Sequence, residues 1–289
     1  MFKGLVVLAS VTLATVTGCG GSNQNELDDQ VIPSMQQNIP LEVFITDTFI
    51  PREGYPNQLS HGELVLQIAS GQHSFELTPQ NNVTFHRSTS LFPDVLYNQP
   101  SKTSVINRSF SPSIIDNNVR RDIDGIAALA ISPLVITSAG NTQNTCTPEA
   151  AEIGRASGLY LPGTPLYRAC DMAMVAAIDN GEDSNWIVVG PDFSFGQKPG
   201  AVLKHRWIGA PYNFHLLDTN FQGTSFGAPF VSAMAIEILQ KIPSITAEEV
   251  AEIIFETAID MGEPGVDEIW GHGIINPEGI RAQIIQMGY

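Results

Sequence analysis

A serine stands at the start of an apolar segment, a position that suits a nucleophile. Ser225 lies within Gly223-Thr224-Ser225-Phe226-Gly227, and residues 226–241 are apolar on nearly every face. This run predicts a buried helix, with Pro229 in its first turn, where a missing N–H costs nothing. The helix start would present free N–H groups and a positive dipole end beside Ser225, which suits a reaction that creates an oxyanion. The alternative is a helix-capping serine.

A nucleophilic serine needs a base, and the base needs a carboxylate that orients it. Asp47 ends the hydrophobic segment 41–46, and His61 opens an apolar stretch that includes a short helix at 64–69. Asn141 follows another hydrophobic segment and offers an amide donor. Parallel sheets present functional groups at the carboxyl ends of their strands, so these residues are expected to meet Ser225. The alternatives are turn or capping roles for Asp47 and Asn141, and a structural role for the histidine.

The elements that must position these residues alternate between strands and helices. Thr246 and Glu249 form a capping-box pattern before a helix that we expect Gly262 to end. The alternation predicts one α/β domain with a mostly parallel central sheet and helices on both faces. The predicted strands cover 41–46, 105–107, 134–137 and 186–190, and the predicted helices cover 64–69, 120–131, 163–178 and 226–241.

Length and charge limit the function classes. The chain has 289 residues, which is enough for one α/β domain with a large core. Charged residues make up only 15% of the chain, so its bulk is not disordered. It carries 14 Lys and Arg against 30 Asp and Glu, a net charge of −16, which argues against nucleic acid as a partner.

The order Asp, His, Asn, Ser resembles that of the subtilisin-like serine proteases, or subtilases. Seven segments carry the resemblance. Val105–Phe110 is similar to the family's segment whose edge binds extended substrate, and Ala210-Pro211 lies where the family often has Ala-Pro-Gly. The other five are a strand ending in the acid, a His-Gly segment, an Asn motif, the serine motif and a closing segment. The closing segment is most similar to that of autotransporter-type subtilases. These five segments are Val43–Thr48, Ser60–Val65, Thr137–Asn141, Gly223–Pro229 and Val266–Asn276. The resemblance covers about residues 40–285 and implies a single subtilisin-like peptidase domain over residues 41–289.

The resemblance implies a serine endopeptidase acting on polypeptides. Ser225 would be the nucleophile, His61 the base and Asp47 its orienting carboxylate, while Asn141 and the Ser225 N–H would form the oxyanion hole. An extended substrate would lie along Ser109, Phe110 and Ser111. No cofactor and no metal ligand is assigned, and structural calcium or an oligomeric state is not readable from this sequence.

Departures from the family pattern leave other functions open. Thr48 and Phe49 replace a small residue and a glycine, Glu63 replaces a threonine, and Gly227 stands where Ala or Ser is usual. The main alternative is a catalytically silent lipoprotein of the same fold that binds a peptide or protein. An esterase is disfavoured because the order Asp–His–Ser differs from that of the α/β-hydrolases.

The N-terminal residues resemble a bacterial lipoprotein signal. Residues 1–18 combine a Lys3 leader with an apolar stretch, and Cys19 would be the lipidated residue, followed by a polar tether over 19–40. This predicts an exported protein anchored by lipid in the cell envelope, at the outer membrane; the alternative is an ordinary signal peptide. In that oxidising compartment Cys146 and Cys170 could form a disulfide, the alternative being two separate buried thiols.

Overall fold

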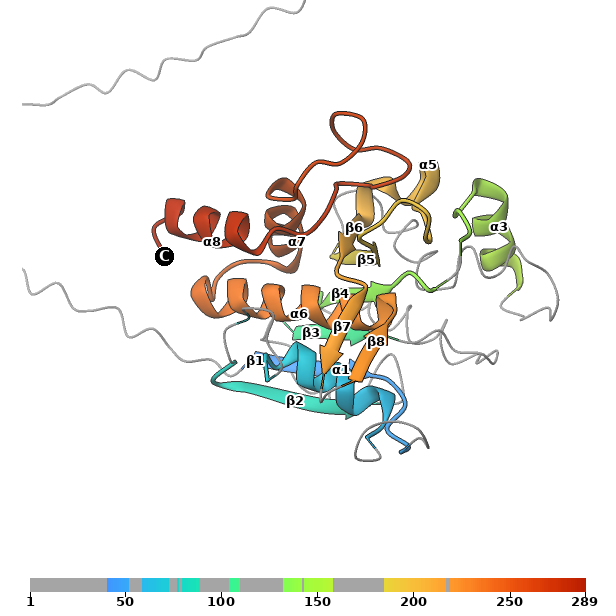
Figure 1. Ribbon diagram of the computed structural model, residues 1–289. Coiled ribbons are helices and arrows are strands. Elements are labelled where there is room, and N and C mark those ends of the chain that lie inside the picture. Colours follow the sequence, from blue (N-terminus) through green and yellow to red (C-terminus); the bar gives the residue numbers. More distant parts are fainter. Residues whose placement is uncertain are drawn as a thin grey trace, which may run out of the picture. The chain divides into compact units, whose positions relative to one another are not determined.

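Six parallel strands form the central sheet, in the order β2-β1-β3-β4-β5-β6 (Figure 1). The computed structural model describes residues 41–51, 59–72, 77, 80–88, 104–109, 132–141, 143–157, 185–216 and 219–289. The strands are β1 (Leu41–Thr46), β2 (Val83–Ser88), β3 (Ser104–Arg108), β4 (Leu134–Ser138), β5 (Trp186–Pro191) and β6 (Trp207–Ala210). The predicted α/β class is therefore confirmed, although β2 and β6 were not expected from the sequence.

The central strands are rich in apolar residues, and the polar residues that they contain are buried as well, because both faces of the sheet are covered. All residues of β1, β3, β4 and β5 are buried. In the pairing of β1 with β3, Ile45 lies opposite Asn107. Asp47 follows β1 directly and Asn141 follows β4 after a short turn. Because the strands are parallel, both residues lie at the same edge of the sheet.

A long buried helix packs along the sheet and organises the helical layer. This helix, α6 (Thr224–Lys241), contacts β1, β3, β4, β5 and β6. In Figure 1 it runs along the sheet in orange, with α7 (Ala247–Glu256) and α8 (Pro277–Gln286) in red beside it. The remaining described elements are α1 (His61–Ala69), α3 (Pro148–Ser157), α5 (Gly200–Leu203), η4 (Lys204–Arg206) and the hairpin β7 (Asn213–Leu216)–β8 (Thr219–Gln222).

Two sequence predictions about helix ends are wrong. Pro229 is not in the first turn of α6 but inside the helix, so the Ser225 carbonyl lacks its usual i+4 N–H partner. The helix α7 ends at Glu256, well before Gly262, because the chain turns there and Ile259 forms a bridge with Ile274. The predicted capping box of Thr246 and Glu249 is present. The helices predicted at 120–131 and 163–178 lie outside the described residues.

Candidate active site

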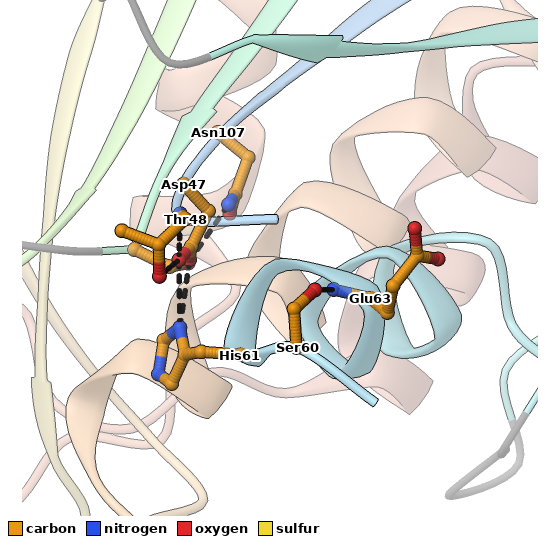
Figure 2. A network of polar contacts seen from close by, with 7 residues as sticks. Asp47, Thr48, Ser60, His61, Glu63 and Asn107 are labelled. Carbon is orange, nitrogen blue, oxygen red and sulfur yellow. Dashed lines mark hydrogen bonds and ion pairs between the residues drawn. The ribbon is translucent and has the colours of Figure 1, made fainter. Parts of the chain in front are cut away.

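The carboxylate of Asp47 holds the ring of His61. His61 Nδ1 lies 2.8 Å from Asp47 Oδ1 and 2.9 Å from Oδ2 (Figure 2). Asp47 is fully buried, and its Oδ1 also accepts a bond of 2.6 Å from the Thr48 N–H. An ionised carboxylate is acceptor-only, so Nδ1 carries the ring proton in this pair. The second ring nitrogen, Nε2, faces away from Asp47 and is available to accept a proton.

Helix α1 fixes where His61 stands. His61 is its first residue, and the buried Ser60 caps the helix by accepting a bond of 3.1 Å from the Glu63 N–H. The Gly62 N–H donates to the Thr48 carbonyl at 3.0 Å, which ties the helix start to the residue after Asp47. The Asp47–His61 pair is thus supported by backbone contacts on both sides, and the predicted proximity of these two residues is what the geometry shows.

Ser225 is the second residue of α6, and it is not the helix cap. Gly223 occupies the cap position and has no side chain with which to cap the helix. The sequence alternative of a capping serine is therefore wrong. Ser225 is partly exposed at the positive end of a long buried helix, where the N–H groups of the first turn lack carbonyl partners four residues earlier in the chain. This environment favours negative charge developing beside the hydroxyl.

Asn141 is locked in one orientation beside this helix start. Its Oδ1 accepts from the Thr224 N–H at 2.9 Å and from the Thr224 hydroxyl at 3.1 Å. The same hydroxyl accepts a bond of 3.0 Å from the Gly140 N–H. Because Oδ1 is engaged by two donors, the Nδ2 group of Asn141 is left as the donor end of the amide. Asn141 is itself exposed, so this donor can meet a bound molecule.

Gly223 leaves room for that amide. Its φ is 145° and ψ is 152°, a conformation that L side chains rarely adopt. A Cβ at this position would lie 3.0 Å from Asn141 Nδ2 and 3.3 Å from Oδ1. The Gly223 N–H donates to the Tyr212 carbonyl at 2.9 Å, which fixes the segment before α6. A glycine is therefore required both by the backbone and by the close approach of Asn141.

His61 and Ser225 come from packed helices but share no direct hydrogen bond among the bonds of the described residues. Helices α1 and α6 are in contact, and the ring of Phe226, next to Ser225, lies 5.2 Å from the His61 ring. Bonds between a nucleophile and its base are often loose before substrate binds. The geometry therefore brings Asp47 to His61 directly and places Ser225 on the neighbouring helix.

Only some of the other predicted site residues lie within the described part of the chain. Ser109 is fully buried, and its hydroxyl accepts a bond of 2.8 Å from Asn107 Nδ2, so its side chain is not presented to a substrate. Phe110 and Ser111 lie outside the described residues, as do Cys19 and Cys170. Cys146 is buried and disulfide-bonded, while the identity of its partner stays a prediction.

Several supporting residues were not predicted. Thr224 stands within the serine motif, yet only the structure reveals that it holds Asn141. Ser232, on the same helix, donates to Asn107 at 3.0 Å and ties α6 to β3. Arg87, on β2, forms a hydrogen bond to Glu63. Strand β2 was not predicted from the sequence, because it mixes polar and apolar residues. A sequence signal existed only for Thr224, through its position next to Ser225.

An acid lies close to the segment that precedes α6. Asp192 follows β5, and burial raises the pKa of its carboxyl above the ordinary 3.8, against the opposing effect of hydrogen bonds from the N–H groups of Asp192 and Tyr212. Tyr212 in turn accepts the Gly223 N–H. Asp192 is thus linked through Tyr212 to the glycine that borders Asn141.

The described part of the chain contains neither a candidate metal cluster nor a membrane-spanning helix. In it, no three or more His, Cys, Asp or Glu residues gather in a way that could hold a metal ion. None of its helices combines the length and the apolar character needed to span a bilayer.

Comparison with curated proteins finds serine proteases. An extracellular serine protease of Serratia marcescens is 26% identical over 156 residues, which is 50% of this chain and 15% of that protein. A thermostable alkaline protease of Halalkalibacterium halodurans is 25% identical over 156 residues, or 50% of this chain and 40% of that protein. The chain thus spans well under two thirds of the length of these relatives.

Solved structures share the fold over most of the chain. A lanthipeptide protease has a TM-score of 0.52 and 16% identity, with 86% of this chain and 88% of that chain covered. A structure of the subtilase cytotoxin SubAB has a TM-score of 0.53 and 15% identity, with 86% and 84% covered. These identities show the fold alone.

The sequence profile of the subtilase family matches residues 81–273. The match includes Asn141 and Ser225 and begins after Asp47 and His61, so the positions of the latter two come from the geometry described above. With its parallel sheet, its long helix behind the serine motif and this match over most of its length, the chain belongs to the subtilase family.

Proposed function

We propose that this chain is a serine endopeptidase that hydrolyses peptide bonds through Asp47, His61 and Ser225, with Asn141 in the oxyanion hole. The observation that carries the proposal is the Asp47–His61 pair, with both carboxylate oxygens within 2.9 Å of Nδ1. This contact leaves Nε2 of the ring turned away from Asp47 (Figure 2), and the ring of Phe226, the residue after Ser225, has its centre 5.2 Å from that of the imidazole. A carboxylate, an oriented imidazole and a serine at a helix start form the constellation that acyl transfer requires.

The proton movements follow from this arrangement. Ser225 Oγ forms a bond to the substrate carbonyl carbon while His61 Nε2 takes the hydroxyl proton. Asp47 keeps the ring in the Nδ1–H tautomer and stabilises the imidazolium that results. The imidazolium then gives its proton to the leaving amine, and the C–N bond breaks. Water, deprotonated in turn by His61, releases the acyl group and regenerates Ser225.

Charge that develops on the carbonyl oxygen is met by donors already in position. Asn141 Nδ2 is the free end of an amide whose oxygen is held by Thr224. The Ser225 N–H belongs to the first turn of α6 and has no helical acceptor. Because neither donor has to reorganise when the oxyanion forms, each contributes about 3–4 kcal/mol to lowering the barrier.

The substrate is proposed to be a polypeptide in extended form. The segment that follows β3, through Ser109, Phe110 and Ser111, would pair with its backbone. The buried Ser109 hydroxyl supports a main-chain role for this residue. The net charge of −16 disfavours strongly acidic substrates.

Labelling by a fluorophosphonate probe tests the nucleophile. We expect the folded full chain to be labelled on Ser225 and to cleave fluorescent casein, and Ser225→Ala to lose both activities while it stays folded. Ser244→Ala is the matched control, because Ser244 is an exposed serine in the loop after α6. If Ser225→Ala is labelled as fast as the wild type, the assignment is wrong.

The same probe separates the enzyme from its main alternative. A catalytically silent protein of this fold would bind a peptide or protein partner but would not react with a fluorophosphonate. The Asp47–His61 contact favours the enzyme, because a binding protein has no need for a carboxylate that orients an imidazole. Folded protein that resists labelling would favour the binding protein.

Export and lipid anchoring are also part of the proposal. The apolar stretch that ends at Cys19 supports a lipoprotein signal, with the peptidase domain carried outside the cytoplasm at the outer membrane. In that compartment Cys146 would pair with Cys170. Incorporation of an alkyne-labelled fatty acid into the wild type and not into Cys19→Ser, followed by membrane fractionation, tests the anchor.

A further inference from the structure

We propose that Phe49, Glu63 and Arg87 form a clamp that positions His61 against Asp47. The clamp is defined by these three side chains, which come from the segment after β1, the first turn of α1 and strand β2. The inference rests on the proposed function, because its effect is exerted through the Asp47–His61 pair. It assigns a positioning role to β2, a strand that contributes no residue to the triad.

Strand β2 holds the aspartate side of the pair through its backbone. Arg87 lies opposite Ile45 in the parallel pairing of β2 with β1. The carbonyl of Ser88 accepts a bond of 2.9 Å from the Asp47 N–H. The end of β2 therefore fixes the backbone of Asp47 directly.

The same strand holds the histidine side through a side chain. Arg87 Nε lies 2.7 Å from Glu63 Oε1, and Nη2 lies 3.1 Å from Oε2, a two-pronged contact. This hydrogen bond to Glu63 raises the pKa of the Arg87 guanidinium. Glu63 stands in the first turn of α1, two residues after His61, and its N–H is bound by the cap Ser60. A planar guanidinium that binds both carboxylate oxygens fixes direction as well as distance.

The ring of Phe49 packs against both Arg87 and the start of α1. The Arg87 guanidinium carbon lies 6.0 Å from the centre of the Phe49 ring. The same ring packs on Gly62 so closely that a Cβ there would lie 2.8 Å from it. Gly62 follows His61, so the ring packs beside the backbone that carries the imidazole. Phe49 and Glu63 are two of the positions at which the chain departs from the subtilase pattern, and Arg87 contacts both.

Because the Arg87–Glu63 pair is partly exposed, its effect on the position of His61 can be distinguished from its effect on folding stability. The side chains of Arg87 and Glu63 are 53% and 29% exposed. Ion pairs this exposed contribute little to folding stability, because water screens them and their side chains lose freedom. Catalysis is far more sensitive, since a misplacement of about 1 Å can cost a factor of about 100. Loss of the clamp should therefore change the chemistry much more than the folding.

Saturation kinetics of fluorophosphonate labelling on the full chain test this. We expect Arg87→Met and Glu63→Gln each to lower the maximal labelling rate of Ser225 about tenfold. The apparent dissociation constant of the probe should stay within about twofold, because neither residue contributes to probe binding. The double variant should be no slower than either single variant, since both remove the same contact. Arg87→Lys, which keeps the charge and loses the fork, should lie between Arg87→Met and the wild type.

The chain offers a matched control in a second two-pronged pair. Arg281 Nε lies 2.8 Å from Glu237 Oε1 and Nη2 lies 3.1 Å from Oε2, between α8 and α6. Arg281→Met should lower the melting temperature and leave the maximal labelling rate unchanged.

The possible results either support or overturn the clamp. It is wrong if Arg87→Met is labelled at the wild-type rate, or if Arg281→Met loses as much rate as Arg87→Met does, because the effect would then be general destabilisation. Ser225→Ala separates this inference from the proposed function. If Ser225→Ala is unlabelled while Arg87→Met is labelled at the wild-type rate, the clamp alone is wrong. If Ser225→Ala is still labelled, both the clamp and the proposed function are wrong.

Discussion

Thr224 donates two hydrogen bonds to the Oδ1 atom of Asn141, one from its N–H at 2.9 Å and one from its hydroxyl at 3.1 Å. The two donors leave Asn141 no choice of orientation, because an amide NH₂ group in the same place could not accept either bond. Thr224 is buried, so this lock is shielded from competing water, whereas Asn141 is exposed. The residue beside the proposed nucleophile thus sets the direction of the proposed oxyanion donor.

Thr224→Val is expected to slow acylation of Ser225 about tenfold. Valine keeps the shape and the N–H bond to Asn141, but it removes the hydroxyl that binds Asn141 and Gly140. Removal of an oxyanion donor outright costs about 100-fold to 1,000-fold, so a donor that is only less well held should cost less. The measurement is the rate of fluorophosphonate labelling well below the melting temperature. Thr224→Ser keeps the hydroxyl and should label like the wild type; equal loss in both variants would contradict the lock.

Asp47→Asn is expected to lower the labelling rate about 10,000-fold without unfolding the protein. An amide can present an NH₂ group to Nδ1, which would leave the proton on Nε2, the nitrogen that must act as the base. Since the substitution removes a fully buried charge, folding should not suffer greatly. Labelling rates and circular dichroism measured on the same samples check both parts. A variant within tenfold of the wild type would mean that Asp47 does not orient the base.

The strands and the serine motif were predictable because their signals are local. Short runs of apolar residues identify β1, β3, β4 and β5, since strands buried on both faces carry no regular polar alternation. Ser225 and Asn141 stand in short motifs whose neighbours are adjacent in sequence. The capping box of Thr246 and Glu249 has the same local character, and it is present as predicted.

The remaining features depend on contacts between distant segments. Strand β2 is half-exposed and polar, so its sequence lacks the apolar signal, and its place is set by pairing with β1. In the sequence Glu63 is only a departure from a motif, whereas in the fold it binds Arg87. Gly262 was predicted to end α7, but the bridge between Ile259 and Ile274 already requires the chain to turn earlier. Sequence neighbours carry none of this information.

Gly223→Ala is expected to reduce both stability and activity. The backbone conformation would cost about 1–3 kcal/mol for a residue with a side chain. The new Cβ would also press on Asn141 Nδ2 at 3.0 Å and push the amide from its place. Gly265→Ala is the control, because Gly265 also has a positive φ, of 87°, but a Cβ there meets nothing within 4 Å. The melting temperature should fall for both variants, and the rate of fluorophosphonate labelling should fall only for Gly223→Ala. Equal labelling rates would show that Asn141 tolerates the added carbon.

Asp192→Asn is expected to stabilise the protein at neutral pH and to have no effect in acid. Burial raises the pKa of Asp192 above 3.8, so the folded protein holds this proton more tightly than the unfolded chain does. The stability that protonated Asp192 contributes is therefore complete below pH 3.8 and is lost as the pH rises through the raised value. Asparagine stays neutral at every pH and can still accept the Tyr212 N–H, so the variant avoids this loss. Because Asp192 is only half-buried, the rise in melting temperature at pH 7 should be at most about 2 °C. Melts of both proteins from pH 3 to pH 7 measure the difference, and a difference that is constant across this range, or that favours the wild type at pH 7, would contradict the role given to burial.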